Sequence, residues 1–196
     1  MLRMCLTTAV TYDFTAIPTL STPRLRLEPL GPEHVDGAWV TVQDAESRRL
    51  TGTRATFTEA QIRAWLEGLG GRDDRADWAI MREGDGAYLG EVVLLDHDPE
   101  NRSIGFRIGL AGEAHFGQGY GTEATAAVVD HAFDVIGVHR VELEVYAFNP
   151  RAQRVYEKVG FRVEGVRRDA LLWDAVWVDA VMMSMLVTDP RPVSAT

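Results

Sequence analysis

Cysteine is almost absent from the sequence. It occurs once among 196 residues, at Cys5, so no disulfide bond can form within the chain, and we expect a cytoplasmic protein. Apolar runs fall well short of the roughly 18 residues that a membrane-spanning helix needs, so we expect no membrane partner. The five histidines have neither the mutual spacing nor the cysteine partners of a zinc site, so we predict no metal.

Positive charge is also scarce. Lysine occurs once, at Lys158, and 20 lysine and arginine residues face 29 acidic ones, which gives a formal net charge of −9. This balance argues against a nucleic-acid partner and weakly favours a cationic small molecule or a basic peptide. The length suits one domain with one substantial core. We expect this domain at residues 21–188, with residues 1–20 as a loose N-terminal extension and residues 189–196 as a flexible tail.

Secondary-structure signals follow one another in a mixed order: strand, helix, helix, three strands, helix, strand, helix and two strands. Thr58 and Gln61 have the capping-box spacing of a helix start. Asn149, Pro150 and Gly160 have the spacing of an N-cap, a first helical residue and a C-cap. The order predicts an α+β fold, a central twisted mixed sheet of about seven strands flanked by about four helices.

A glycine-rich stretch, HFGQGYGTEA, spans residues 115–124 just before a predicted helix. Its glycines stand at alternate positions, so the stretch matches neither the dinucleotide fingerprint nor the P-loop. Consecutive backbone amides at a helix start can nevertheless bind a phosphate group. The residues alone leave two alternatives, a phosphate site and a flexible surface turn.

A second block follows about thirty residues later, LEVYAFNPRAQRVYEKVGF at residues 143–161. Together with FGQGYGTEA and the terminal EGVRRDALLWDAVWVDAVMMSML, it resembles the GNAT superfamily of acyl-CoA-dependent N-acyltransferases. Within that superfamily it is most similar to the ribosomal-protein N-terminal and spermidine acetyltransferase branch. The resemblance covers residues from about 20 to about 188 and implies a single GNAT-like domain.

The resemblance implies an enzyme that uses acetyl-CoA as acyl donor and a primary amine as acceptor. The acceptor would be a protein N-terminus or a small polyamine-like or antibiotic-like molecule. No cysteine or Gly-x-Ser-x-Gly element is placed to carry an acyl intermediate, so we expect direct transfer in a ternary complex. The alternative is a non-catalytic acyl-CoA-binding sensor of the same fold. A homodimer is one assembly compatible with this interpretation.

The resemblance also implies where coenzyme A binds. Amides of the glycine turn would hold the pyrophosphate, and the strand before the turn would bind pantetheine. Phe116 stands where the broad superfamily has arginine or glutamine, and agrees with the aromatic residue usual in the branch. Arg154 could approach the adenosine-phosphate end. The full predicted cofactor-binding set is Ile108, Gly109, Leu110, Phe116, Gly117, Gln118, Gly119, Tyr120, Gly121, Thr122, Asn149 and Lys158.

Two residues are implied as catalytic. An amine must lose its proton before it attacks, and the departing thiolate benefits from a proton donor. The resemblance places Tyr156 as the general acid and Glu144 as the base. Tyr156 also lies on an apolar helix face, which alone predicts a core residue. Glu142 lies on the same strand face as Glu144 and is a weaker candidate for the base. Both glutamates could also simply be solvent-exposed residues of this face. Tyr146 lies on the same face and could line the acceptor pocket.

The acceptor pocket is expected between the early helices and the last strand pair. Residues 43–57 are interpreted as a variable-looking connection, and the final strands meet at Asp174-Ala175, where alanine resists a left-handed turn. We therefore expect an unusual shape for this hairpin. The candidate acceptor residues are Arg48, Arg49, Arg54, Phe57, Trp173, Trp177 and Asp179.

Overall fold

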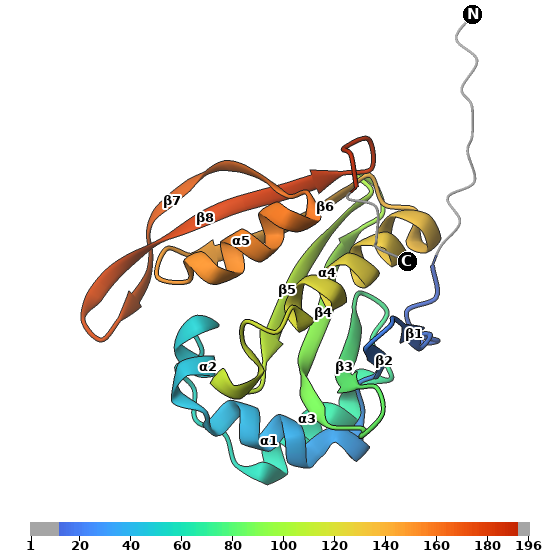
Figure 1. The fold of residues 1–196 in the computed structure, drawn as a ribbon, viewed down its shortest axis with the longest axis vertical. Coiled ribbons are helices and arrows are strands. Elements are labelled where there is room, and N and C mark those ends of the chain that lie inside the picture. Colours follow the sequence, from blue (N-terminus) through green and yellow to red (C-terminus); the bar gives the residue numbers. More distant parts are fainter. Residues whose placement is uncertain (1–11, 192–196) are drawn as a thin grey trace, which may run out of the picture.

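The computed structural model describes residues 12–191, and their eight strands form one mixed sheet in the order β1-β2-β3-β4-β5-β6-β8-β7 (Figure 1). The strands are β1 (Leu20–Ser21), β2 (Leu25–Pro29), β3 (Ala76–Arg82), β4 (Tyr88–Asp98), β5 (Ser103–Leu110), β6 (Arg140–Tyr146), β7 (Arg162–Trp173) and β8 (Val176–Leu186). The α-helices are α1 (Val35–Gln43), α2 (Ala45–Leu50), α3 (Glu59–Leu69), α4 (Tyr120–His131) and α5 (Pro150–Val159). Short 3-10 turns occupy Pro32–His34 and Glu113–His115, and one π turn extends α4 over Ala132–Ile136.

All neighbouring strands are antiparallel except β5 and β6. These two run parallel and pair at three positions, from Ser103 with Arg140 to Gly105 with Glu142. Beyond Gly105 the two strands are no longer paired with each other, although each continues and keeps its other neighbour. The sheet is therefore opened along its middle, on the side where β5 and β6 end.

Two apolar clusters cover opposite faces of the sheet. Successive side chains of a strand point to opposite faces, and on β3 Trp78 belongs to one cluster while Ala79 belongs to the other. The larger cluster takes in α4 and α5, for example through Val128 and Tyr156. The smaller one takes in α1 and α3, for example through Ile62. No helix in residues 12–191 is both long and apolar enough to cross a membrane.

The helix boundaries with strong local signals were predicted correctly. Thr58 and Gln61 form the reciprocal capping box at the start of α3. Asn149 Oδ1 accepts a hydrogen bond from the amide of Ala152 at 3.1 Å, and Gly160 ends α5 with a φ of 119°. These helix ends are fixed by hydrogen bonds between residues close in sequence, so the residue types alone were sufficient to predict them.

Three local features were not predicted. Residues 43–57 include the short helix α2, whose N-cap Asp44 accepts a hydrogen bond from Ser47 N at 2.7 Å. Strand β1 was not expected, and its two residues pair with β2. At the last hairpin Asp174 and Ala175 both adopt left-handed φ values, 46° and 64°. A two-residue hairpin matches the strand twist only with positive φ at both positions, and this constraint outweighs the preference of alanine.

The N-terminal segment was expected to be loose, and its described part is packed. Residues 1–11 lie outside the described residues. Phe14 is 3% exposed within the main core, and the hydroxyl of Tyr12 lies 2.9 Å from Nε2 of His131 on α4. The indole N–H of Trp78 also donates to the carbonyl of Pro18 at 2.8 Å, so the segment is held by both apolar packing and a hydrogen bond.

The C-terminal segment, residues 189–196, was expected to be flexible, and its described part is also packed against the domain. Arg191 forms ion pairs with Asp130 at 2.9 Å and Asp134 at 2.8 Å, so the chain is held against the end of α4 up to this residue. The expected flexibility of residues 192–196 concerns positions outside the described range.

Replacing Phe14 by alanine tests the docking of the N-terminal segment. The change removes a buried ring that stacks edge-on against Tyr12 at 4.8 Å between centroids. We expect the free energy of unfolding, measured by urea denaturation, to fall by about 3 kcal/mol. Thr19→Ala, an exposed position in the same segment, should change it by less than about 0.5 kcal/mol. Equally small losses in the two variants would contradict the docking.

Candidate active site

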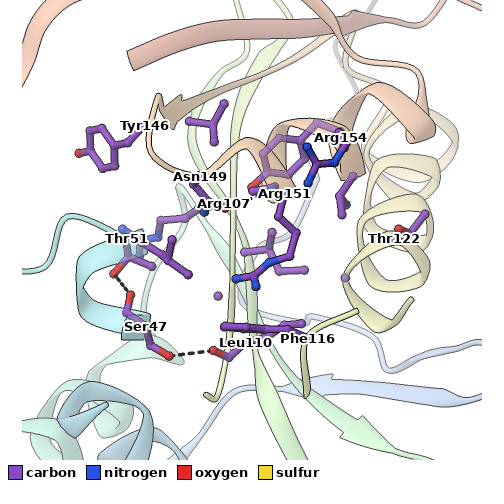
Figure 2. A pocket seen from close by; sticks show the side chains of 18 of the residues that line it. Ser47, Thr51, Arg107, Leu110, Phe116, Thr122, Tyr146, Asn149, Arg151 and Arg154 are labelled. Atoms are coloured by element: carbon purple, nitrogen blue, oxygen red, sulfur yellow. Dashed lines mark hydrogen bonds between the residues drawn. The ribbon is translucent and has the colours of Figure 1, made fainter. Parts of the chain in front are cut away.

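A cavity of about 410 Å³ lies between the unpaired ends of β5 and β6. One wall is the end of β5, and the opposite wall is the end of β6 with the first turns of α5. The glycine turn and the start of α4 close one side, and α2 closes another (Figure 2). The cavity exists because the two strands separate after three paired residues, so its position follows from the sheet topology.

Most of the predicted site residues meet in this cavity. Those that line it are Ile108, Gly109, Leu110, Phe116, Gly117, Gly119, Gly121, Thr122, Glu144, Asn149, Tyr156 and Lys158. Gln118 and Tyr120 do not line it. Gln118 Nε2 donates to the carbonyl of Ala114 at 2.6 Å, and the buried ring of Tyr120 lies 4.9 Å from the guanidinium carbon of Arg24. Their side chains support the turn from outside the cavity.

The glycine turn leaves backbone amides free at the start of α4. Gly117 and Gly119 have φ values of 73° and 86°, in the left-handed region that favours glycine. Inside the turn, Glu123 N donates to Gly119 O at 3.1 Å. The amides of residues 120–122 precede this bond and have no partner within the helix. The positive end of the helix dipole adds to them, so the turn suits an anionic group.

One backbone edge of β5 also faces the cavity. Ile108 pairs with Val92 and Leu110 with Gly90 on the β4 side, and the other edge has no strand partner in this region. Ser47 Oγ on α2 donates to the carbonyl of Leu110 at 3.1 Å and accepts from Gly112 N at 3.2 Å. An extended ligand could therefore hydrogen-bond to the remaining groups of this edge, as an added strand does.

Helix α5 contributes cations that the sequence only partly revealed. Arg151, Arg154 and Lys158 share one helix face and all line the cavity. The guanidinium carbon of Arg151 lies 3.7 Å from the ring centroid of Phe116, across the cavity from its own helix (Figure 2). Asn149 uses its Oδ1 as a cap, while its Nδ2 has no hydrogen-bond partner among residues 12–191. Helical spacing with Lys158 was the signal that could have identified Arg151.

The remaining cavity residues were not among the predicted cofactor or catalytic positions. They are Ser47, Leu50, Thr51, Phe106, Arg107, His115, Val145, Tyr146, Ala152 and Val155. Five of them lie within the two motif blocks, namely His115, Val145, Tyr146, Ala152 and Val155, and Tyr146 was expected toward an acceptor pocket. The other five lie outside these blocks, and contacts between distant segments bring them to the cavity.

Tyr156 is both a core residue and a cavity residue. Its side chain is 6% exposed, and its ring packs against Phe106 and Phe161 with centroid distances of 6.1 and 5.9 Å. No described side chain or backbone group hydrogen-bonds its hydroxyl. Burial raises the pKa of Tyr156 above its usual value, so the hydroxyl keeps its proton at neutral pH and can donate it.

The two glutamates of β6 have different surroundings. They share the exposed strand face, and Val141, Leu143 and Val145 are buried on the other, as predicted. Glu144 lines the cavity and forms an ion pair with Arg167 of β7. Glu142 does not line the cavity and pairs with Arg140 at 2.8 Å. Of the two carboxylates, only that of Glu144 can meet a ligand in the cavity.

The similarity of the chain to a known protein family identifies its class. The family model described as "Acetyltransferase (GNAT) domain" matches residues 24–162. The chain belongs to the GNAT family. It is an N-acetyltransferase by this membership, and enzymes of the GNAT family use acetyl-CoA. The free amides, the unpaired edge of β5 and the cations of α5 fit a long ligand that carries phosphate groups.

Several known GNAT proteins are similar to this chain. A "Probable N-acetyltransferase" of Bacillus subtilis is 33% identical over 138 residues, which cover 70% of this chain and 73% of that protein. The spermidine N(1)-acetyltransferase of Escherichia coli K12 is 32% identical over 92 residues, 47% of this chain and 49% of the relative. The branch suggested by the sequence motifs therefore agrees with these relatives.

Solved structures agree with the GNAT fold. A GCN5-related N-acetyltransferase from Brucella melitensis superposes with a TM-score of 0.74 at 25% identity, covering 88% of this chain and 80% of that one. The spermidine N-acetyltransferase from Vibrio cholerae, solved in complex with CoA and spermine, gives a TM-score of 0.79 at 18% identity and covers 85% and 98% of the two chains. At that identity the second likeness concerns the fold alone.

Gly121→Ala tests whether the glycine turn holds the donor. A Cβ at this position would meet Leu110 Cδ1 at 3.8 Å, an ordinary contact, so the free protein tolerates it, although Gly121 is part of the cavity wall. We expect the Kd for coenzyme A, measured by calorimetry, to rise at least about tenfold, or about 1.4 kcal/mol.

The matched control is Gly68→Ala in α3, where a Cβ would meet nothing within 4 Å. It should leave the Kd unchanged and stabilise the protein by up to about 1 kcal/mol. Unaltered affinity in Gly121→Ala would exclude the glycine turn from donor binding.

Proposed function

We propose that the protein transfers an acetyl group from acetyl-CoA directly to the primary amine of an acceptor, within a ternary complex. One observation carries the proposal. A single cavity joins the free amides at the start of α4 to the hydroxyl of Tyr156 and the carboxylate of Glu144. It thus combines a binding site for an anion with a proton donor and a proton acceptor.

The donor would lie along the wall formed by β5. The amides from Gly117 to Thr122 would bind the pyrophosphate, and the free edge at residues 108–110 would hydrogen-bond to pantetheine. Asn149 Nδ2 would add one donor. Arg154 and Lys158 would face the phosphates at the adenosine end. Acetyl-CoA supplies the thioester, an acyl group already activated for transfer.

The residues of β6 and α5 would then handle the protons. The neutral amine attacks the thioester carbonyl, the new C–N bond forms, and the C–S bond breaks. Glu144 takes the proton that the amine nitrogen loses, directly or through water, and Tyr156 donates its proton to the departing thiolate. The buried ring of Tyr156 keeps the hydroxyl protonated for this step.

The acceptor is proposed to be a small-molecule amine, since acetyltransferases of spermidine are among the relatives. A protein N-terminus is the second acceptor class. An acyl-CoA sensor is the alternative function, and binding of acetyl-CoA without turnover of any amine or peptide would favour it. Cytoplasmic location and a homodimer remain predictions. Val176 and Trp177, 61% and 58% exposed, offer an apolar surface for the homodimer.

Tyr156→Phe tests the proton donor. The substitution removes only the hydroxyl and preserves the packing against Phe106 and Phe161. We expect kcat, measured by release of free thiol, to fall about 100-fold or more, with the Kd for coenzyme A unchanged.

The control for this change is Tyr88→Phe, which removes a buried hydroxyl that lacks a hydrogen-bond partner in the described part of the chain. It should leave kcat intact. Because burial raises the pKa of Tyr156 above the usual value of about 10, ionisation of Tyr156 should not lower the wild-type kcat as the pH increases toward that value. Unchanged turnover in Tyr156→Phe would remove this residue from the mechanism.

Glu144→Gln tests the base. The variant keeps the shape of the side chain and loses the proton acceptor, so we expect kcat to fall about 100-fold. Glu142→Gln, a change to the carboxylate outside the cavity, should keep the wild-type kcat. An unchanged kcat in Glu144→Gln would exclude Glu144 as the base.

A further inference from the structure

A second cavity lies beside α2, at the tip of the β7–β8 hairpin. Its volume is about 320 Å³, and it is lined by Ala45, Arg48, Arg54, Trp173 and Asp174. Helix α2 contributes to both cavities, because Ser47, Leu50 and Thr51 line the first and Ala45 and Arg48 line the second. At 100° per residue Leu50 points away from Ala45 and Arg48, whereas Thr51 lies about 60° from Arg48.

The lining of this second cavity carries two arginines and one aspartate. Arg48 Nη2 donates to the carbonyl oxygens of Arg54 and Ala55 at 2.9 and 3.1 Å, so Arg48 fixes the loop that carries Arg54. The Nε of Arg48 is buried and has no hydrogen-bond partner in the described part of the chain. The side chain of Arg54 forms no ion pair with any residue between positions 12 and 191. Arg54, and the Nη1 group of Arg48, which has no hydrogen bond within residues 12–191, therefore keep donors for a ligand.

Two acids near this end of the molecule are already paired with arginine. Glu46 on α2 binds Arg49 at 2.8 Å, and Glu144 binds Arg167. A polyamine acceptor needs free carboxylates along its length, because each ammonium loses water as it binds. Among the residues that line the second cavity, Asp174 is the one acid and Arg48 and Arg54 are the two bases, so the lining has a net positive charge.

The loop that carries Arg54 also contacts the first cavity. Gly52 packs against the ring of Tyr146, which lines the first cavity, and a Cβ at Gly52 would lie 2.8 Å from the Tyr146 hydroxyl oxygen. Arg54 follows Gly52 by two residues and lines the second cavity. Two residues span at most about 7 Å, so an acceptor bound beside Tyr146 can extend along this loop to Arg54.

We propose that the acceptor is an amine that also carries an oxyanion, a carboxylate or a phosphate, bound by Arg54 and Arg48 beside the ring of Trp173. The inference rests on the proposed acetyl transfer and specifies its substrate class. Arginine binds both oxyanions through paired N–H donors. Diamines and polyamines place a cation at this position and are poor acceptors.

Three probes of equal length distinguish these classes: 6-aminohexanoate, 6-aminohexyl phosphate and 1,6-diaminohexane, each with shorter and longer homologues. For wild type we expect kcat/KM for the better oxyanion probe to exceed that for the matched diamine at least about tenfold. Comparison of the carboxylate and the phosphate tells which oxyanion the cavity takes. A diamine that is acetylated faster than both oxyanion probes would overturn the proposal.

Arg54→Gln should raise KM for the oxyanion probe about tenfold or more and leave the diamine unaffected, while Arg54→Lys should restore part of the preference. The control Arg63→Gln removes an exposed arginine of α3, outside both cavities, and should change neither substrate. Equal effects of Arg54→Gln on oxyanion and diamine would contradict a specific oxyanion contact. Arg48 is left intact because its substitution would release the loop.

Calorimetry on the CoA-loaded protein separates this proposal from the proposed function. Binding of the oxyanion probe that is weakened by Arg54→Gln, without acetylation of any amine, would support the oxyanion site and contradict the transfer reaction. Acetylation of diamines alone would support the transfer reaction and contradict the oxyanion site. Failure of every oxyanion homologue to bind the loaded protein would also overturn the proposal.

Discussion

The brief pairing between β5 and β6 determines where this protein can bind a ligand. Three paired positions join the two strands, and beyond them each strand keeps only its outer neighbour. Backbone groups that would normally complete a sheet are exposed toward a cavity. The cavity therefore has a hydrogen-bonding wall before any side chain is considered, and the glycine turn and α5 add charge to it from opposite sides.

Local signals in the sequence were sufficient for much of the fold. The caps at Thr58 and Asn149 and the glycine stop at Gly160 depend on neighbouring residues, and all were predicted. The short helix α2 and the packing of Phe14 were missed. Phe14 packs against distant parts of the chain, whereas α2 has a local N-cap at Asp44 but only six residues. Short helices depend on tertiary packing more than on propensity, so their sequences carry a weak signal.

In the candidate site, too, some residues were predictable from local motifs and others were not. The glycine turn, Asn149 and Tyr156 could be located from motifs, and they do line one cavity. The family resemblance ranked Glu144 above Glu142, whereas strand periodicity alone places both on the same face. Their partners on other strands distinguish them. The preference for a cationic small molecule or a basic peptide, expected from the net charge of −9, stays a prediction, although two arginines and one aspartate line the second cavity.

Phe116 has a further consequence for how charge reaches the glycine turn. Its ring supports the guanidinium of Arg151 at 3.7 Å, and stacking uses only the flat face of that ion. The N–H groups in the plane of the guanidinium stay available. Phe116, at a position where the broad superfamily has arginine or glutamine, thus holds a cation from α5, Arg151, beside the glycine turn. An anion bound at the turn would then be attracted by Arg151 of α5 as well as by the amides of α4. The affinity for that anion would therefore depend on the distance between the two helices.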